Sequence, residues 1–138
     1  MRAAVEGAVV LPMQTSEDVV RLRMLLRDQL LAIGCTATEQ TKIITAASEL
    51  ARNTLRYGGG GEAHLITRTE RDRRGVTISF LDDGPGISDL ELALTSGYTT
   101  GGGMGLGLGG AKRLADEFDI ETGVGLGTVV TITKWKPF

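Results

Sequence analysis

Hydrophobic and polar residues recur along this chain with two different periods, and these periods predict its elements. Apolar residues spaced three or four apart predict two long helices, over residues 15–34 and 36–57. Each helix opens on a capping-box pattern, Thr15-x-x-Asp18 and Thr36-x-x-Glu39, in which two side chains bind each other's backbone amides. The helical spacing predicts these core positions: Val19, Leu22, Leu25, Leu26, Leu30, Ile33, Ile43, Ile44, Ala47, Leu50 and Leu55.

Alternating and short apolar stretches predict the remaining elements. We expect strands over residues 5–12, 62–70 and 75–82, short helices over 88–97 and 105–117, and a closing hairpin over 118–135. No repeat or linker interrupts this order. It predicts one α+β domain over residues 1–138, with helices on one face of a mainly antiparallel, mixed sheet.

Composition and charge narrow the function classes. The chain has 138 residues, 41% hydrophobic and 23% charged, which suits one globular domain. A net charge of −2 gives no electrostatic reason to bind nucleic acid or an anionic membrane. The basic positions alternate with acidic ones and are interpreted as solvated faces: Arg21, Arg23, Arg27 and residues 68–74.

Cysteine and histidine are too scarce for several kinds of site. Cys35 is the single cysteine, which excludes an internal disulfide and a multi-cysteine metal site, and His64 is the single histidine, which disfavours a histidine-based triad or zinc site. No apolar run approaches the roughly 18 residues of a membrane span. Glu6 interrupts the apolar N-terminus, which makes a poor signal peptide. A cytoplasmic protein is therefore expected.

The segment from Gly97 to Gly110 is unusual because eight of its fourteen residues are glycine. Such a segment is costly to order, since glycine loses the most backbone entropy. It contains G-x-G-x-x-G, but no strand precedes it, and no Gly-Lys-Ser/Thr follows as a Walker A loop requires. Two interpretations stay open from this segment alone: an anion-binding loop that leads into a helix, and a surface loop without a ligand.

Three other segments carry polar residues at fixed positions. "SELARN" places Glu49 and Asn53 four residues apart, on one face of the second helix. "FLDDGPGI" places Asp82 at the end of an apolar strand, before a glycine turn, and "GVGLGTVV" places Thr128 at the start of the last strand. Each segment alone fits an ordinary structural role.

Together, and in this order, the four segments resemble the nucleotide-binding boxes of the GHKL superfamily, which includes DNA gyrase, MutL and histidine kinases. The boxes are an N box (49–53), D-x-G-x-G (82–86), a glycine-rich lid (103–108) and a terminal G-x-G-T (125–128). The resemblance implies the Bergerat fold, a two-layer α/β sandwich. The order of elements expected from the periods agrees with that fold.

The chain is further similar to the anti-sigma-factor serine/threonine kinases of the RsbT type, which are stressosome switch kinases. The similar pieces are "SELARN", "DDGPGISDL", "TTGGGMGLGLGGAKRLADEF" and "GTVVTITKW". The resemblance implies an ATP-dependent protein kinase consisting of the ATP-binding domain alone. It also implies STAS-domain antagonists of the RsbS or RsbR kind as substrates, and a PP2C-type phosphatase or other output protein as partner, in stress-response partner switching.

The resemblance assigns roles to individual residues. Asp82 would bind the adenine amino group with support from Thr128, Asn53 would hold Mg²⁺, and Glu49 would act as general base. The remaining residues expected to bind ATP are Gly84, Gly86, Thr99, Thr100, Gly101, Gly102, Gly103, Met104, Gly105, Leu106, Gly107 and Leu108.

Two other functions remain as alternatives. One is an anti-sigma or adaptor module in which nucleotide gates partner choice without turnover. The other is a histidine-kinase catalytic domain, which the short lid and the missing flanking helices disfavour. The presence of both Glu49 and Asn53 favours the protein kinase.

Overall fold

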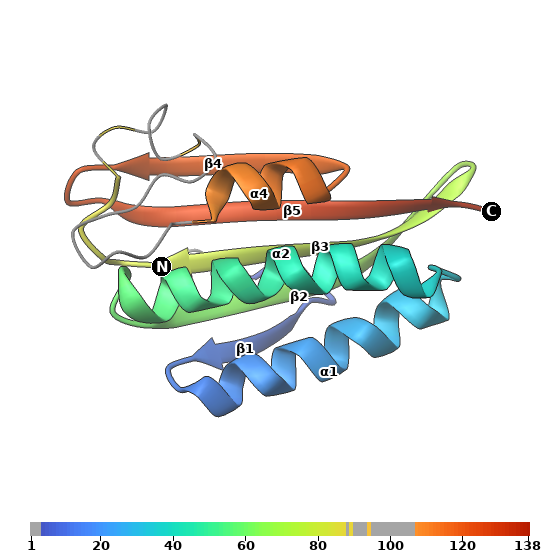
Figure 1. The fold of residues 1–138 in the computed structure, drawn as a ribbon, viewed down its shortest axis with the longest axis horizontal. Coiled ribbons are helices and arrows are strands. Elements are labelled where there is room, and N and C mark those ends of the chain that lie inside the picture. The colour runs from blue at the N-terminus through green and yellow to red at the C-terminus, as the bar shows by residue number, and fades with distance from the viewer. Residues whose placement is uncertain (1–3, 88, 90–93, 95–106) are drawn as a thin grey trace.

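The computed structural model describes residues 4–87, 89, 94 and 107–138. Its elements, in chain order, are β1 (Val9–Met13), α1 (Ser16–Ala32), α2 (Ala37–Arg56), β2 (Gly61–Glu70), β3 (Arg73–Asp82), α4 (Leu108–Leu114), β4 (Glu117–Gly123) and β5 (Gly127–Pro137). Within these residues, the helices all lie on one face of the sheet (Figure 1). The expected two-layer α+β architecture is confirmed.

The two long helices begin where the capping boxes predict. At α1, Thr15 Oγ1 accepts from the Asp18 amide at 3.3 Å, and the Asp18 carboxylate accepts from the Thr15 amide at 3.0 Å. At α2, Thr36 and Glu39 make the same reciprocal pair, at 3.2 and 2.8 Å. Each pair satisfies two amides that the first turn of a helix leaves without a partner.

The strands form one sheet in the order β1-β2-β3-β5-β4, in which all the described pairs are antiparallel rather than mixed. After β3 the described chain forms α4, enters the sheet again as the edge strand β4 and returns as β5. In the centre of the sheet, β3 pairs along its whole length with both β2 and β5. This register places Asp82, the last residue of β3, level with Thr128 of β5.

The core fills the space between the helices and the sheet. Residues on the inner faces of α1 and α2 pack against inward-facing positions of β2, β3 and β5, such as Leu65, Ile78 and Ile132, which are at most 1% exposed. The positions that the helical spacing predicts are buried or packed against this core. Burial of this apolar surface is the main force that holds the helices on the sheet.

Several predicted element boundaries were wrong, and two of the differences have a clear physical cause. The first strand begins at Val9 rather than residue 5, because a turn closed by Ala8 N to Val5 O at 3.0 Å precedes it, and it extends through Pro12 to Met13. Proline is tolerated there because β1 is an edge strand.

The helix predicted over 105–117 ends at Leu114, because the Asp116 amide instead joins the sheet by donating to Thr133 O at 3.0 Å. The helix predicted over 88–97 lies outside the described residues, apart from Asp89 and Leu94.

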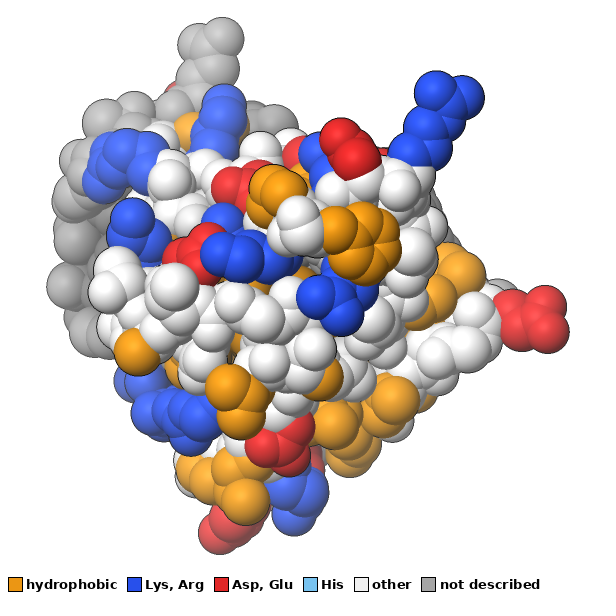
Figure 2. All heavy atoms as spheres, turned by 90° about the vertical axis from the view of Figure 1, so that its right-hand side faces the viewer, with side chains coloured by type: hydrophobic (Ala, Val, Ile, Leu, Met, Phe, Trp, Pro, Cys, Tyr) orange, Lys and Arg blue, Asp and Glu red, His pale blue; other side chains and the backbone are white. Residues whose placement is uncertain are grey.

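Charged residues are interleaved on the end of the molecule that carries the β2–β3 hairpin and the C-terminus (Figure 2). On the hairpin, Glu70 forms ion pairs with Arg68 and Arg73. Both arginines also lie against the ring of Trp135, with guanidinium carbons 4.9 and 3.8 Å from the ring centre. Arg68 and Arg73 are thus partly solvated, as expected, and also cover an aromatic ring. Arg74 differs from the expectation, because its Nε is buried and has no hydrogen-bond partner within the described residues. None of the described helices is both long and apolar enough to span a membrane.

Glu39 of the second capping box also connects the start of α2 to the C-terminal end of β5. Glu39 accepts from Lys136 Nζ at 3.2 Å and pairs with Lys134 Nζ at 3.3 Å. The backbone amide of Thr36, followed by these lysines, lowers the pKa of Glu39 to about 2. The charged carboxylate therefore stabilises the folded protein at neutral pH.

We expect Glu39→Gln to lower the free energy of unfolding by about 1 kcal/mol at pH 7. Because the pKa of Glu39 is lower in the folded than in the unfolded chain, this stabilisation is complete above about pH 4.5. It disappears as the pH falls towards 2. Urea unfolding at pH 7 and pH 3 measures it, with Glu6→Gln in the exposed N-terminal turn as control. An equal loss of stability at both pH values would contradict the assignment.

Candidate functional site

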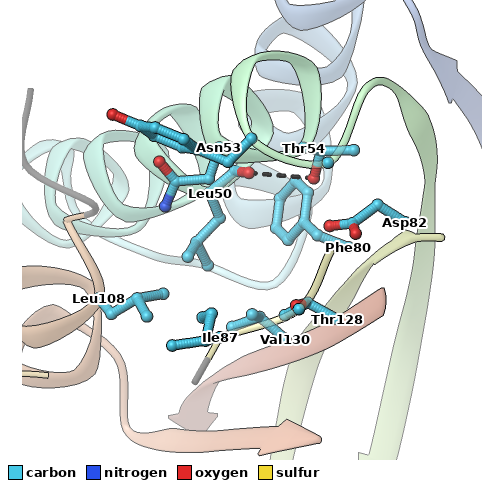
Figure 3. Close-up of a pocket in the computed structure, with 12 residues that line it drawn as sticks. Leu50, Asn53, Thr54, Phe80, Asp82, Ile87, Leu108, Thr128 and Val130 are labelled. Carbon is cyan, nitrogen blue, oxygen red and sulfur yellow. Dashed lines mark hydrogen bonds between the residues drawn. The ribbon is translucent and has the colours of Figure 1, made fainter. Parts of the chain in front are cut away.

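A pocket opens between α2 and the ends of β3 and β5 (Figure 3). One wall comes from α2, the opposite wall from the two strands, and Leu108 at the start of α4 closes one side. Its lining is mainly apolar, with a few polar groups, as is usual for small-molecule sites. The lining residues are Leu50, Asn53, Thr54, Tyr57, Gly58, Phe80, Asp82, Gly86, Ile87, Leu108, Thr128 and Val130.

The carboxylate of Asp82 points into this pocket from the end of β3 (Figure 3). Burial raises its pKa above the ordinary value, and the backbone amides of Gly84 and Thr128 oppose that shift only in part. Gly84 N–H donates to Asp82 Oδ1 at 2.9 Å, which fixes the orientation of the carboxylate. Such a group is a strong acceptor whose cost of burial falls when a ligand donates to it.

Thr128 lies beside Asp82, as expected from the resemblance, because the two residues are paired in the sheet register. Its hydroxyl shares a hydrogen bond of 2.9 Å with the hydroxyl of Thr122 on β4. Thr122 Oγ1 also accepts from the Ile87 amide at 3.0 Å. Thr122 therefore joins the loop after β3 to the strand that carries Thr128.

Glu49 and Asn53 occupy different places relative to the pocket, although they are one turn apart on α2. Asn53 lines the pocket opposite the strands, whereas Glu49 is not among the lining residues. The Glu49 side chain is 45% exposed and pairs with Arg52, with Oε1 3.0 Å from Nη1. Its carboxylate lies against Gly107, where a Cβ atom would come within 3.1 Å of Oε2.

Two glycines in the site are required by close contacts. Gly86 has φ of +77° and its α-carbon faces the carbonyl of Gly123, so no side chain fits. A Cβ at Gly84 would lie 2.7 Å from the Gly58 α-carbon, at the end of α2. The glycines of the D-x-G-x-G box therefore bring the loop after β3 close to both α2 and β4.

Most of the glycine-rich segment that is expected to bind ATP lies outside the described residues: Thr99, Thr100, Gly101, Gly102, Gly103, Met104, Gly105 and Leu106. The described end of this segment does reach the site. Gly107 is the N-cap residue of α4, with φ of +69°, and Leu108 is buried in the pocket wall.

The sequence interpretation missed several lining residues. Tyr57 and Gly58 follow Asn53 by about one helical turn, so the same face of α2 could have indicated them. Phe80 and Val130 are inward-facing strand positions that looked like ordinary core. Thr122 had no sequence signal, because its role depends on β4 lying beside β5.

These residues fit a nucleotide better than an all-protein metal cage. The apolar lining suits a planar base, and the Asp82 carboxylate suits an exocyclic amine. The described residues contain no cluster of three or more His, Cys, Asp or Glu side chains that could hold a metal ion. Mg²⁺ needs no such cluster, since it binds through few protein oxygens together with phosphates and water. The amide oxygen of Asn53 is suited to that role.

Comparisons with known proteins identify the family to which the chain belongs. Residues 13–134 match the histidine kinase-like ATPase domain family. The chain is 40% identical to serine/threonine-protein kinase RsbT of Bacillus subtilis, covering 88% of this chain and 91% of that one. It is 32% identical to the anti-sigma F factor of Thermoanaerobacter sp., covering 72% and 73%.

Among solved structures, the catalytic domain of histidine kinase ThkA is similar, with a TM-score of 0.53, 14% identity, and coverage of 92% of this chain and 94% of that one. At this identity the likeness shows the fold alone.

The fold and the pocket together define an ATPase domain of the histidine kinase-like type. The chain belongs to the histidine kinase-like ATPase domain family. Within it, the chain is similar to the RsbT kinase over nearly the whole length of both proteins.

Proposed function

We propose that this protein transfers the γ-phosphoryl group of ATP to a serine or threonine of a STAS-domain antagonist of the RsbS or RsbR kind. The chain is an RsbT-like serine/threonine kinase. We further propose that it works as one domain over residues 1–138 in the cytoplasm, in a partner-switching stress pathway. There it binds a PP2C-type phosphatase or another output protein, and neither nucleic acid nor membrane.

The observation that carries the proposal is the 40% identity to kinase RsbT over 88% of the chain. The pocket supports it, because Asn53 and Asp82 face one space from opposite walls. A pocket of this kind alone would suit any adenine-nucleotide binder, so the transfer activity rests on the comparison.

In the proposed reaction, Asp82 accepts a hydrogen bond from the adenine amino group, and Thr128 supports it from the neighbouring strand. Guanine is rejected because it would leave the partly buried carboxylate without a donor. The glycines of residues 101–107 bind the phosphates through their backbone amides, and Thr99 and Thr100 add hydroxyl contacts. When Mg²⁺ is bound, it offsets phosphate charge, and Asn53 holds it through the amide oxygen.

Glu49 acts on the acceptor protein rather than on ATP. Its carboxylate accepts the proton of the serine or threonine hydroxyl as that oxygen forms a bond to the γ-phosphorus. The bond from phosphorus to the β–γ bridging oxygen breaks, and ADP leaves. Its place outside the pocket and its exposure suit a base that an incoming protein must reach. Most of the rate enhancement in such transfers comes from positioning and charge neutralisation.

The test is phosphate transfer from labelled Mg·ATP to the STAS-domain proteins of the same genome. We expect acid-stable label on serine or threonine, and at least a 100-fold lower rate with Asn53→Ala. Lys42→Ala, an exposed change on the same helix, is the control and should keep the wild-type rate. Acid-labile label would indicate a histidine kinase instead.

The alternative is an anti-sigma or adaptor module in which nucleotide gates binding without turnover. The 32% identity to an anti-sigma F factor supports this alternative function. Tight ATP binding without transfer to any STAS-domain protein would support it over the kinase.

A further inference from the structure

The hydroxyl of Thr122 has three hydrogen-bonding neighbours among the described residues. It lies 3.0 Å from the amide nitrogen of Ile87, 3.1 Å from the carbonyl oxygen of Gly127 and 2.9 Å from the hydroxyl of Thr128. Ile87 and Thr128 line the ATP pocket, whereas Thr122 does not. Thr122 can therefore affect a bound nucleotide only through these neighbours.

The three neighbours decide the direction of each hydrogen bond. A threonine hydroxyl has one proton to donate and two lone pairs that accept. The Ile87 amide only donates and occupies one lone pair of Thr122, whereas the Gly127 carbonyl only accepts and takes the proton of Thr122. The second lone pair of Thr122 therefore receives the proton of Thr128. With the opposite direction, the contact with the Gly127 carbonyl would join two acceptors and lose its hydrogen bond.

This direction determines what Thr128 can offer a ligand. Its proton is bound by Thr122, so its oxygen presents only lone pairs to the ATP pocket. Asp82 is paired with Thr128 in the sheet register and points into the same pocket (Figure 3), where its ionised carboxylate is also an acceptor. The strand wall of the pocket thus presents two acceptors side by side. Such a wall suits a group with two N–H donors, such as the 6-amino group of adenine.

A purine with a 6-oxo group has the opposite chemistry. Its oxygen at position 6 is an acceptor, as in guanine, and this wall offers it no donor. A free threonine hydroxyl can turn and donate to such an oxygen, because its hydrogen rotates to suit the partner. The Thr128 hydroxyl cannot do so without giving up its bond to Thr122. A polar group that is buried without its partner costs binding energy, so this restriction raises the selectivity for a 6-amino purine.

We propose that Thr122 is a positioning residue for nucleotide selectivity, which fixes the Thr128 hydroxyl as an acceptor and thereby favours ATP over 6-oxo purine nucleotides. The identity of the ligand as ATP rests on the proposed function. The positioning role deepens that function, because a residue outside the pocket then controls which base the pocket accepts.

The test compares the affinities of ATP and inosine triphosphate, which carries an oxygen in place of the 6-amino group. Calorimetry measures both for the wild type, Thr122→Val and Thr122→Ser. We expect Thr122→Val to reduce the preference for ATP about tenfold, because valine keeps the shape of threonine but releases the Thr128 proton. Thr122→Ser keeps the hydroxyl and should keep the wild-type preference. An equal loss of affinity for both nucleotides in Thr122→Val would show a merely structural role and overturn the proposal.

A double-mutant cycle separates the route through Thr128 from the route through Ile87, whose amide also loses its acceptor in Thr122→Val. Thr128→Val removes the hydroxyl that Thr122 is proposed to hold. In that background, Thr122→Val should leave the preference for ATP within about twofold of Thr128→Val alone. A further loss of about tenfold would show that Thr122 acts through the loop at Ile87, against the proposal.

The matched control is Thr131→Val, which breaks a similar hydroxyl pair on the same strand. Thr131 Oγ1 lies 2.8 Å from the hydroxyl of Ser79, on the face of the sheet opposite to Thr128. This variant should leave both affinities unchanged. The same change of ATP preference in Thr131→Val would also overturn the proposal, because loss of any threonine hydroxyl on β5 would then have that effect.

Binding and phosphate transfer together separate this positioning role from the proposed function. If Thr122→Val changes the preference for ATP but the wild type transfers no phosphate, the role of Thr122 stands and the kinase assignment fails. If the wild type transfers phosphate but binds ATP and inosine triphosphate equally well, the kinase assignment stands and the role of Thr122 is wrong.

Discussion

Glu49→Ala is expected to reduce phosphate transfer by at least a thousandfold while ATP affinity stays within twofold of wild type. The two effects separate because Glu49 lies outside the pocket that would hold ATP, beside Gly107 and Arg52. The variant should remain folded, since the exposed Glu49–Arg52 pair contributes at most about 0.5 kcal/mol to stability. Single-turnover transfer and equilibrium ATP binding measure the two quantities independently.

Glu49→Gln is the sharper version of this experiment. It keeps the size of the side chain and its contact with Gly107, and it removes only the ability to accept a proton. We expect nearly the same loss of transfer as with alanine. Transfer at close to the wild-type rate with Glu49→Gln would show that Glu49 is not the base, even if the chain is a kinase.

Asp82→Asn is expected to weaken ATP binding about 100-fold with little change in fold. The amide oxygen of asparagine can still accept from Gly84 N–H, as Asp82 Oδ1 does at 2.9 Å. The amide nitrogen then takes the place of the second oxygen, and it cannot accept from an adenine amino group. GTP binding, already weak, should not fall further.

The control for this variant is Asp83→Asn, because Asp83 is the exposed neighbour of Asp82 and does not line the ATP pocket. ATP titrations monitored by calorimetry should give the wild-type affinity for it. Similar losses for both variants would indicate a general charge effect and contradict a specific contact of Asp82 with adenine.

Wild-type ATP binding should also depend on pH through Asp82. Burial raises the pKa of Asp82, so the carboxylate gains a proton at a higher pH than an exposed aspartate does. The protonated form is the poorer acceptor, and affinity should fall as the pH is lowered through this raised pKa. Asp82→Asn should lack this dependence.

Several features of the fold could be predicted because they depend on neighbours a few residues away. The capping boxes at Thr15 and Thr36 bind backbone within three residues, and the structure confirms both. The alternation in β2 and β3 decides which side chains face the helices. The placement of Asp82 beside Thr128 was instead implied by the resemblance to the nucleotide-binding boxes, and the sheet register pairs the two residues.

Other features depend on contacts between distant segments. The helix α4 stops at Leu114, where the Asp116 carboxylate accepts from the Trp135 amide at 2.7 Å and the chain joins the sheet. Thr122 supports the site only because β4 lies next to β5. Neither contact has a local pattern that could have predicted it.

The sequence by itself determined the class of elements, the helix starts and the four nucleotide-binding boxes, because periodicity, caps and turns act over short stretches of chain. Tertiary structure alone decided that Asn53 faces the pocket while Glu49 lies outside it, and that the hydroxyl of Thr122 meets that of Thr128. A one-turn spacing on a helix puts two residues on the same face, but only the packing of neighbouring elements decides what each one touches. The role proposed for Asn53 depends on its facing the pocket, and the role proposed for Glu49 depends on its lying outside the pocket.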